Sequence, residues 1–293
     1  MDIVAILIGL GPLIGWGLFP TIASKFGGRP VNQILGATVG TLIFALCFVF
    51  IQGMRLPTGA NLIFSLISGI GWAFGQIITF KAFGLIGSSK AMPITTAFQL
   101  LGASLWGVFA LGDWPGISNK IIGFTALLVI LVGAQMTVWS EKKEKQYARN
   151  LRKAVILLLI GEIGYWAYSA APQATDISGM QAFLPQAIGM VIASIIYAFI
   201  NMKDGNAFIE KVSWKQIISG FFFAFAALTY LISAQPDMNG LATGFVLSQT
   251  SVVLATLTGI YFLNQRKTLK ELIVTIIGLI LIIVAAAVTV FIK

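Results

Sequence analysis

Residues Ala91 to Gly107 read AMPITTAFQLLGASLWG, an apolar stretch that can span a bilayer as a helix. The stretch carries hydroxyl groups at Thr95 and Thr96 and an amide at Gln99. An amide that faces lipid has no hydrogen-bond partner, which costs free energy. We therefore expect these polar side chains to face the interior of a helical bundle or a wet cavity.

The same pattern returns about 150 residues later in the chain. Residues Gly240 to Gly259 read GLATGFVLSQTSVVLATLTG, in which Gln249 takes the place of Gln99. Trp16 and Trp166 match at the same offset. This constant offset predicts an internal duplication, with one polar helix at the centre of each half.

The composition indicates an integral membrane protein. Apolar residues make up 58% of the chain and charged residues 10%, and the mean hydropathy is +0.93, far outside the range of soluble domains. Ten apolar segments are long enough to span a bilayer. They are residues 3–23, 31–52, 61–80, 91–112, 117–139, 154–171, 180–200, 214–234, 241–263 and 269–291. We therefore expect an all-α, multi-pass membrane protein with ten transmembrane helices.

The distribution of basic residues predicts the orientation of these helices. The loops after the first, third, fifth, seventh and ninth expected spans hold 16 of the 19 Lys and Arg residues. Loops rich in Lys and Arg stay in the cytoplasm, so both termini are expected to be extracellular. The net charge of +9 then reflects membrane topology, and no nucleic-acid partner is expected.

Each half of the duplication has five helices, so the second half must enter the membrane from the opposite side. We expect a first five-helix repeat over residues 1–140, a basic cytoplasmic linker over 141–153, and a second five-helix repeat over 154–293. Inverted repeats that meet at mid-membrane are typical of secondary transporters, which bind their substrate at the repeat interface.

Several kinds of chemistry are excluded by the residues that the sequence lacks. Cys47 is the one cysteine, so no intrachain disulfide can form, and there is no histidine for a metal site or a Ser-His pair. No GxxxxGK[ST] motif is present. We expect no catalytic residues, no bound metal and no cofactor, and an intramembrane enzyme is disfavoured.

The first three expected spans contain polar and aromatic candidates. Trp72 and Gln76 lie one turn apart and could offer a sugar an apolar face and hydrogen bonds, although the pair also suits ordinary packing. Asn32 and Gln33 open the second span, where amides could bind a substrate or simply lie among lipid headgroups. Trp16, near the middle of the first span, suits either a cavity wall or a packed core.

Glu162 is the one carboxylate near the middle of an expected span, and Tyr165 and Trp166 follow on the same helical face. An ionisable group at that depth is costly and suggests a functional site. We expect Glu162 to couple transport to protons or to make a charge-assisted hydrogen bond to a substrate. A purely structural role is the alternative.

Amides, hydroxyls and aromatic rings dominate this inventory, with one buried acid and no buried cation. That mixture favours a neutral, polyhydroxylated ligand over an anion or a lipophilic cation. The candidate substrate-binding residues are Gln99, Gln249, Gln76, Trp72, Trp16, Gln186, Tyr165, Trp166, Thr96, Asn32 and Gln33.

Several long motifs resemble the glucose/ribose porter family of the drug/metabolite transporter superfamily, and its ribose branch most of all. They are GPLIGWG from Gly11, GGRPVNQ from Gly27, GWAFGQ from Gly71, IGEIGYWAYSAAPQAT from Ile160 and LSQTSVVLATLTG from Leu247. The resemblance extends over essentially the full length. It implies two inverted five-helix halves, sugar uptake at the plasma membrane, and proton-coupled entry.

The expected function is therefore secondary active import of a monosaccharide, ribose first, by alternating access. The proton gradient is the expected energy source, and protons and the lipid bilayer are the other expected partners. Two alternatives remain: a glucose permease of the same family, and a drug or metabolite exporter. The oligomeric state is left open.

Overall fold

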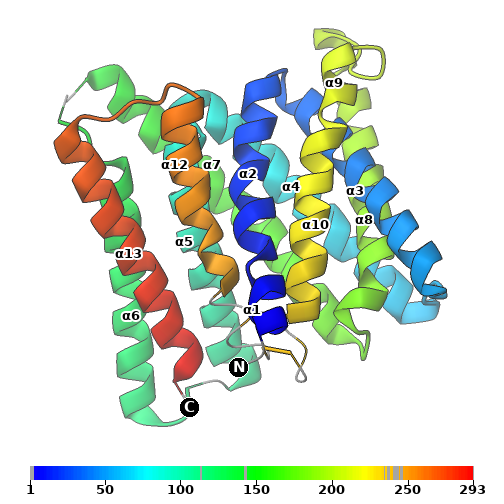
Figure 1. The fold of residues 1–293 in the computed structure, drawn as a ribbon, viewed down its shortest axis with the longest axis horizontal. Coiled ribbons are helices and arrows are strands. Elements are labelled where there is room, and N and C mark those ends of the chain that lie inside the picture. The colour runs from blue at the N-terminus through cyan, green and yellow to red at the C-terminus, as the bar shows by residue number, and fades with distance from the viewer. Residues whose placement is uncertain are drawn as a thin grey trace.

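The computed structural model describes residues 3–112, 114–141, 144–233, 235, 238–239, 244 and 247–292. These residues form a bundle of helices, and no strand is found among them (Figure 1). Nine of the described helices are long and apolar enough to cross a membrane. A shorter apolar helix, Leu247–Phe262, lies where the ninth span is expected, and the beginning of that span falls largely outside the described residues.

The spans follow one another with short connections. The helices are α1 (Ile3–Gly9), α2 (Gly11–Phe26), α3 (Pro30–Gln52), α4 (Gly59–Ile86), α5 (Ser88–Trp106), α6 (Gly116–Val138), α7 (Lys145–Ala170), α8 (Gly179–Ile200), α9 (Lys211–Lys215), α10 (Ile217–Ser233), α12 (Ser251–Phe262) and α13 (Leu269–Phe291). The first span is divided at Leu10, because Pro12 in the first turn of α2 has no backbone N–H to continue α1. A short π-helix, Gly107–Leu111, follows α5. Short 3-10 helices, Ala171–Ala174 and Met202–Asp204, follow α7 and α8.

The basic segment differs from its expected form as a linker, because it is helical from Lys145 onward. Its sequence, KQYARNLRK, is rich in good helix formers, and its charged side chains can lie among headgroups and water. Tyr147 anchors this extension by donating a hydrogen bond to the Val138 carbonyl at the end of α6, 2.5 Å away.

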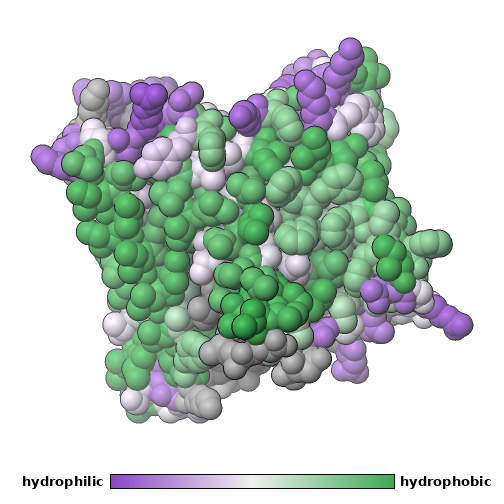
Figure 2. All heavy atoms as spheres, in the orientation of Figure 1, coloured by the Kyte–Doolittle hydropathy of each residue, from purple (hydrophilic) through white to green (hydrophobic). Residues whose placement is uncertain are grey.

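The surface has the character of a protein embedded in lipid. Figure 2 shows an apolar band across the middle of the face in view, with hydrophilic residues gathered toward its two ends. Large apolar side chains point outward from the helices, and Phe50 is 87% exposed. Cys47 is exposed on the same kind of surface. The chain is a multi-pass membrane protein.

Two ends of the bundle can be distinguished in Figure 1. The basic end holds the connections at residues 27–29, 201–210 and 263–268 and the beginning of α7. The terminal end holds both chain termini. Between these ends α4 packs along α7 and α8, α10 packs along α2 and α3, and α12 packs against α2 and α5. The helices α6 and α13 pair with each other at one edge of the bundle (Figure 1).

Candidate functional site

A cavity of ≈ 320 Å³ lies among α2, α4, α5, α7, α10 and α12. Nine of the candidate residues line it: Trp16, Trp72, Gln76, Thr96, Gln99, Glu162, Tyr165, Trp166 and Gln249. At the mouth the wall is formed by the ends of α5 and α7 and the beginning of α12. The cavity therefore extends from the middle of the bundle toward the terminal end.

A hydrogen-bonded cluster occupies the wall that α4 and α7 share. The Tyr165 hydroxyl donates to Gln76 Oε1 at 3.0 Å and lies 3.0 Å from the Thr79 hydroxyl. Glycines allow the two helices to approach closely, since an added Cβ at Gly75 would lie 2.9 Å from the Gly161 carbonyl oxygen. Tyr165 orients the Gln76 amide through its oxygen, and the amide nitrogen donates a hydrogen bond to no described group.

Glu162 and Trp16 bring unpartnered polar atoms to the cavity wall. Glu162 Oε2 and Trp16 Nε1 are both buried, and neither has a hydrogen-bond partner among the described residues. Buried polar atoms are nearly always paired in folded proteins. Both residues line the cavity, so an unpaired acceptor on α7 and an unpaired donor on α2 lie beside it, and a hydroxyl can pair with either kind of atom.

The two matched amides lie on α5 and on the segment that leads into α12. Gln99 Nε2 donates to Thr95 Oγ1 at 3.3 Å, and Gln249 Nε2 donates to Ser248 Oγ at 3.2 Å. Gln99 bonds a residue one turn earlier on the same helix, and Gln249 bonds the residue next to it in the chain. Neither side chain is therefore needed to hold two helices together, and both can bond a ligand.

Aromatic rings from α2, α4 and α10 form the remaining wall. Trp16 lies 5.8 Å from Tyr230 and 6.4 Å from Phe223, measured between ring centroids. Trp72 lies 4.2 Å from Phe223 and is almost fully buried. The rings of α2 and α10 thus gather on one side of the cavity, and the amides and hydroxyls come from α4, α5, α7 and the segment that leads into α12.

Some cavity residues were not candidates in the sequence: Phe19, Thr79, Met92, Trp106, Tyr168, Gln173 and Phe223. Phe223 lies in the run GFFFAF, where nothing in the composition separates a cavity residue from a lipid-facing one. The 150-residue offset pairs Trp72 with the neighbouring Phe222, so it marks this run without singling out Phe223.

Gln186 and Gln33 are candidates that lie outside this cavity. The Gln186 amide is buried and donates to Ser68 Oγ at 2.9 Å, which joins α8 to α4. Gln33 Nε2 donates to the Ala23 carbonyl at 3.2 Å, and the residue lines a separate hollow near the basic end. Both amides hold neighbouring helices together.

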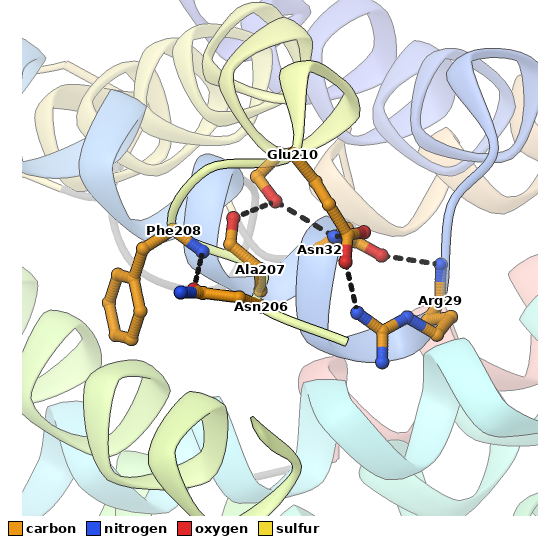
Figure 3. A network of polar contacts seen from close by, with 7 residues as sticks. Arg29, Asn32, Asn206, Ala207, Phe208 and Glu210 are labelled. Atoms are coloured by element: carbon orange, nitrogen blue, oxygen red, sulfur yellow. Dashed lines mark hydrogen bonds and ion pairs between the residues drawn. The ribbon is translucent and has the colours of Figure 1, made fainter. Parts of the chain in front are cut away.

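Asn32 also lies outside the cavity, in a polar network at the start of α3 (Figure 3). Its amide nitrogen donates to Glu210 Oε2 at 2.7 Å and Ser213 Oγ at 2.9 Å, while its oxygen accepts from the Arg29 backbone at 2.8 Å. Arg29 and Glu210 form an ion pair at 2.6 Å. Asn32 therefore caps α3 and ties it to the segment before α9.

The described residues contain no group of three or more His, Cys, Asp and Glu side chains that could hold a metal ion. The walls of the cavity carry an acid, amides, hydroxyls and aromatic rings, and no Lys or Arg lines it. This arrangement suits the reversible binding of a neutral, hydroxyl-rich molecule.

Comparison with known proteins agrees with this chemistry. Residues 7–292 match the model of a family described as "Sugar transport protein". Over the full length of both chains, this sequence is 80% identical to a Staphylococcus epidermidis protein and 75% identical to a Staphylococcus aureus protein, each named "Putative ribose uptake protein RbsU". One crystal structure is 16% identical and has a TM-score of 0.65 over 99% of each chain, which shows a shared fold alone.

Proposed function

Because the chain belongs to the sugar transport protein family, we propose that it imports a monosaccharide, ribose first, by alternating access across the cell membrane. The observation that carries the proposal is the pair of unpartnered atoms, Glu162 Oε2 and Trp16 Nε1, on the wall of one cavity. A sugar hydroxyl donates and accepts, so it can bond either atom.

The proposed sugar site uses both sides of the cavity. Gln76, Gln99 and Gln249 bond sugar hydroxyls, and Thr96 adds a hydroxyl to the same wall. Trp16, Trp72, Tyr165 and Trp166 supply apolar ring faces for the C–H surface of the sugar. Glu162 makes a charge-assisted bond to a hydroxyl or carries the coupled proton.

The proposed mechanism needs two inverted halves, and the backbone contacts of four glycines support them. An added Cβ at Gly40 would lie 2.2 Å from the Ile217 carbonyl oxygen, and one at Gly189 would lie 2.2 Å from that of Leu66. The first contact joins α3 to α10, and the second joins α8 to α4. The second contact therefore repeats the first, since Gly189 follows Gly40 by 149 residues and Ile217 follows Leu66 by 151. A second set follows the same rule. An added Cβ at Gly220 would lie 2.1 Å from the Ala37 carbonyl oxygen, and one at Gly69 would lie 1.9 Å from that of Gln186.

In this arrangement the cavity lies between the halves, because its wall contains the matched pairs Trp16 with Trp166, Trp72 with Phe223, and Gln99 with Gln249. The basic end faces the cytoplasm by the distribution of Lys and Arg. The cavity then extends toward the outside, and both termini are extracellular.

Uptake into proteoliposomes tests the proposed function. Purified protein is supplied with labelled ribose or glucose, each with and without an inward proton gradient. Ribose accumulation that needs the gradient and is lost in Glu162→Gln supports proton-coupled import. Equilibration without accumulation makes the protein a facilitator and leaves Glu162 with a binding role.

A preference for glucose would assign the same mechanism to the other sugar. Absence of flux for both sugars would overturn the proposal. Vesicles of known orientation give the direction of transport. Sugar that moves only from the cytoplasmic face to the outer face would indicate an exporter.

A further inference from the structure

We propose that the sugar leaves the cavity through the seam between α2, α5 and α12, where buried hydroxyls form a second, latent sugar site. This inference rests on the proposed function, since it assigns the release half of the same path. The seam lies between the cavity and the basic end of the bundle.

Hydroxyl-bearing residues close this seam. Thr21 of α2 and Thr258 of α12 are buried, with their hydroxyl oxygens 2.6 Å apart. Ser89 of α5 packs against Gly259 of α12, where an added Cβ would lie 2.9 Å from the Ser89 Cβ. Gln265 Oε1 accepts from the Ser89 backbone at 2.9 Å and closes the outer edge of the seam.

Two hydroxyls in the seam have no partner among the described residues. Ser89 Oγ and Thr256 Oγ1 make no hydrogen bond, and both residues are 0% exposed. A seam that served packing alone would be more stable with apolar groups at these places. These hydroxyls suit a state in which the seam contains water or a polyhydroxylated ligand.

The seam continues the cavity along the same three helices. Phe19 of α2, Met92 of α5 and Ser251 of α12 line the cavity. The hydroxyl residues of the seam follow on each helix within about two turns, always toward the basic end. A sugar that passes between these helices therefore moves from one set of polar groups to the next.

At the opposite end of the bundle, the positions that the repeat offset relates to the seam line the cavity instead of a packed seam. Gly107 at the end of α5 and Ala170 at the end of α7 both line the cavity mouth. The repeat offset relates them to Leu257 and Pro20, which adjoin the Thr258 and Thr21 pair in sequence. Exchange of the two arrangements between the halves would open the seam and close the mouth.

Cross-linking tests the release path. Thr21→Cys and Thr258→Cys are combined in a Cys47→Ala background and reconstituted with ribose. Oxidation is expected to lower ribose flux at least about tenfold, because the seam can no longer open, and reductant restores it. Ribose binding, followed by tryptophan fluorescence, is expected to stay within about twofold, because the cavity is untouched.

The matched control is Thr38→Cys with Ser194→Cys in the same background. This pair joins α3 and α8 through hydroxyls 2.8 Å apart, and neither residue lines the cavity or the seam. Its oxidation is expected to leave flux unchanged. Equal flux through oxidised and reduced Thr21→Cys/Thr258→Cys protein, with the cross-link verified by mass spectrometry, would overturn the release path.

A second measurement separates this inference from the proposed function. Ser89→Cys in the Cys47→Ala background is exposed to a small, membrane-impermeant thiol reagent from the basic side. Labelling that rises when ribose is added supports the path. If the wild type moves no sugar, the proposed function fails. If the wild type moves sugar but the thiol of the Ser89→Cys variant is never labelled from the basic side, the release path through the seam is overturned.

Discussion

The rings of Trp72 and Phe223 lie 4.2 Å apart between centroids, although the two residues are 151 positions apart in the chain. Under the proposed duplication the two rings are counterparts at the 151-residue spacing that also relates Gly69 to Gly220, and both line one cavity. If the two halves are arranged as proposed, the site takes residues from both of them.

We predict that Gln99→Ala and Gln249→Ala each weaken ribose affinity about tenfold, the effect of losing one or two hydrogen bonds to the sugar. Each amide bonds only within its own segment, so the amount of protein in the membrane should not change. Uptake kinetics measure the effect, with Gln146→Ala on the exposed part of α7 as control. Unchanged kinetics in both cavity variants would remove these amides from the site.

Tyr165→Phe is expected to raise the KM for ribose about threefold to tenfold, because Gln76 loses the hydroxyl that orients its amide. Tyr165 acts here as a positioning residue. The maximal rate should change less than the KM. A Gln76→Ala/Tyr165→Phe double variant should bind no worse than Gln76→Ala alone, and fully additive effects would contradict this coupling.

Asn32→Ala should lower the stability of the protein by about 1–2 kcal/mol, since it removes a cap of α3 and the bonds to Glu210 and Ser213. Ribose affinity should not change, because Asn32 lies outside the cavity. Thermal unfolding in detergent and uptake kinetics together check the prediction. A large loss of affinity at wild-type stability would return Asn32 to the sugar site.

Gly69→Ala should strongly destabilise the bundle. An added Cβ would lie 1.9 Å from the Gln186 carbonyl oxygen, so α4 and α8 must move apart. Gly84→Ala on the same helix is the matched control, because nothing lies within 4 Å of its added Cβ. Size-exclusion profiles after detergent extraction should separate the two variants, and similar profiles would contradict the close contact.

Lys267, in the loop before α13, gives a prediction for pH. Burial, together with the nearby charge of Lys90, lowers the Lys267 pKa from 10.5 to about 8. The folded protein therefore releases this proton before the unfolded chain does, so the free energy of unfolding should rise between pH 8 and 10.5. Lys267→Met should abolish this contribution to the rise, and Lys270→Met, at an exposed site, should keep it.

Much of the fold could be predicted from the sequence because a bilayer imposes strong rules. Apolar length predicts the spans, and nine of the described helices are long and apolar enough to cross a membrane. The beginning of α7 was predicted too late, because hydropathy marks where a helix enters lipid and not where it begins. Lys145 to Lys153 are polar and still helical.

The candidate site was predictable to the extent that polarity at depth was rare. Glu162, Gln76 and Gln99 stand out in apolar surroundings, and the structure brings them to one cavity. Gln186 stands out equally, yet its amide bonds Ser68 across a helix pair. Hydrophobicity shows that a buried amide needs a partner, but only the packing shows whether that partner is protein or ligand.

The unlike sides of the cavity have a consequence for stereochemistry. The rings of Trp16, Phe223 and Tyr230 gather on the side of α2 and α10, and the amides and hydroxyls lie on the walls that α4, α5 and α7 form. A pyranose or furanose fits such a slot in the orientation that turns its hydroxyl edge one way and its C–H face the other. Inverting a single carbon turns a hydroxyl toward the rings, so epimers of equal size and formula would be told apart by the handedness of one centre.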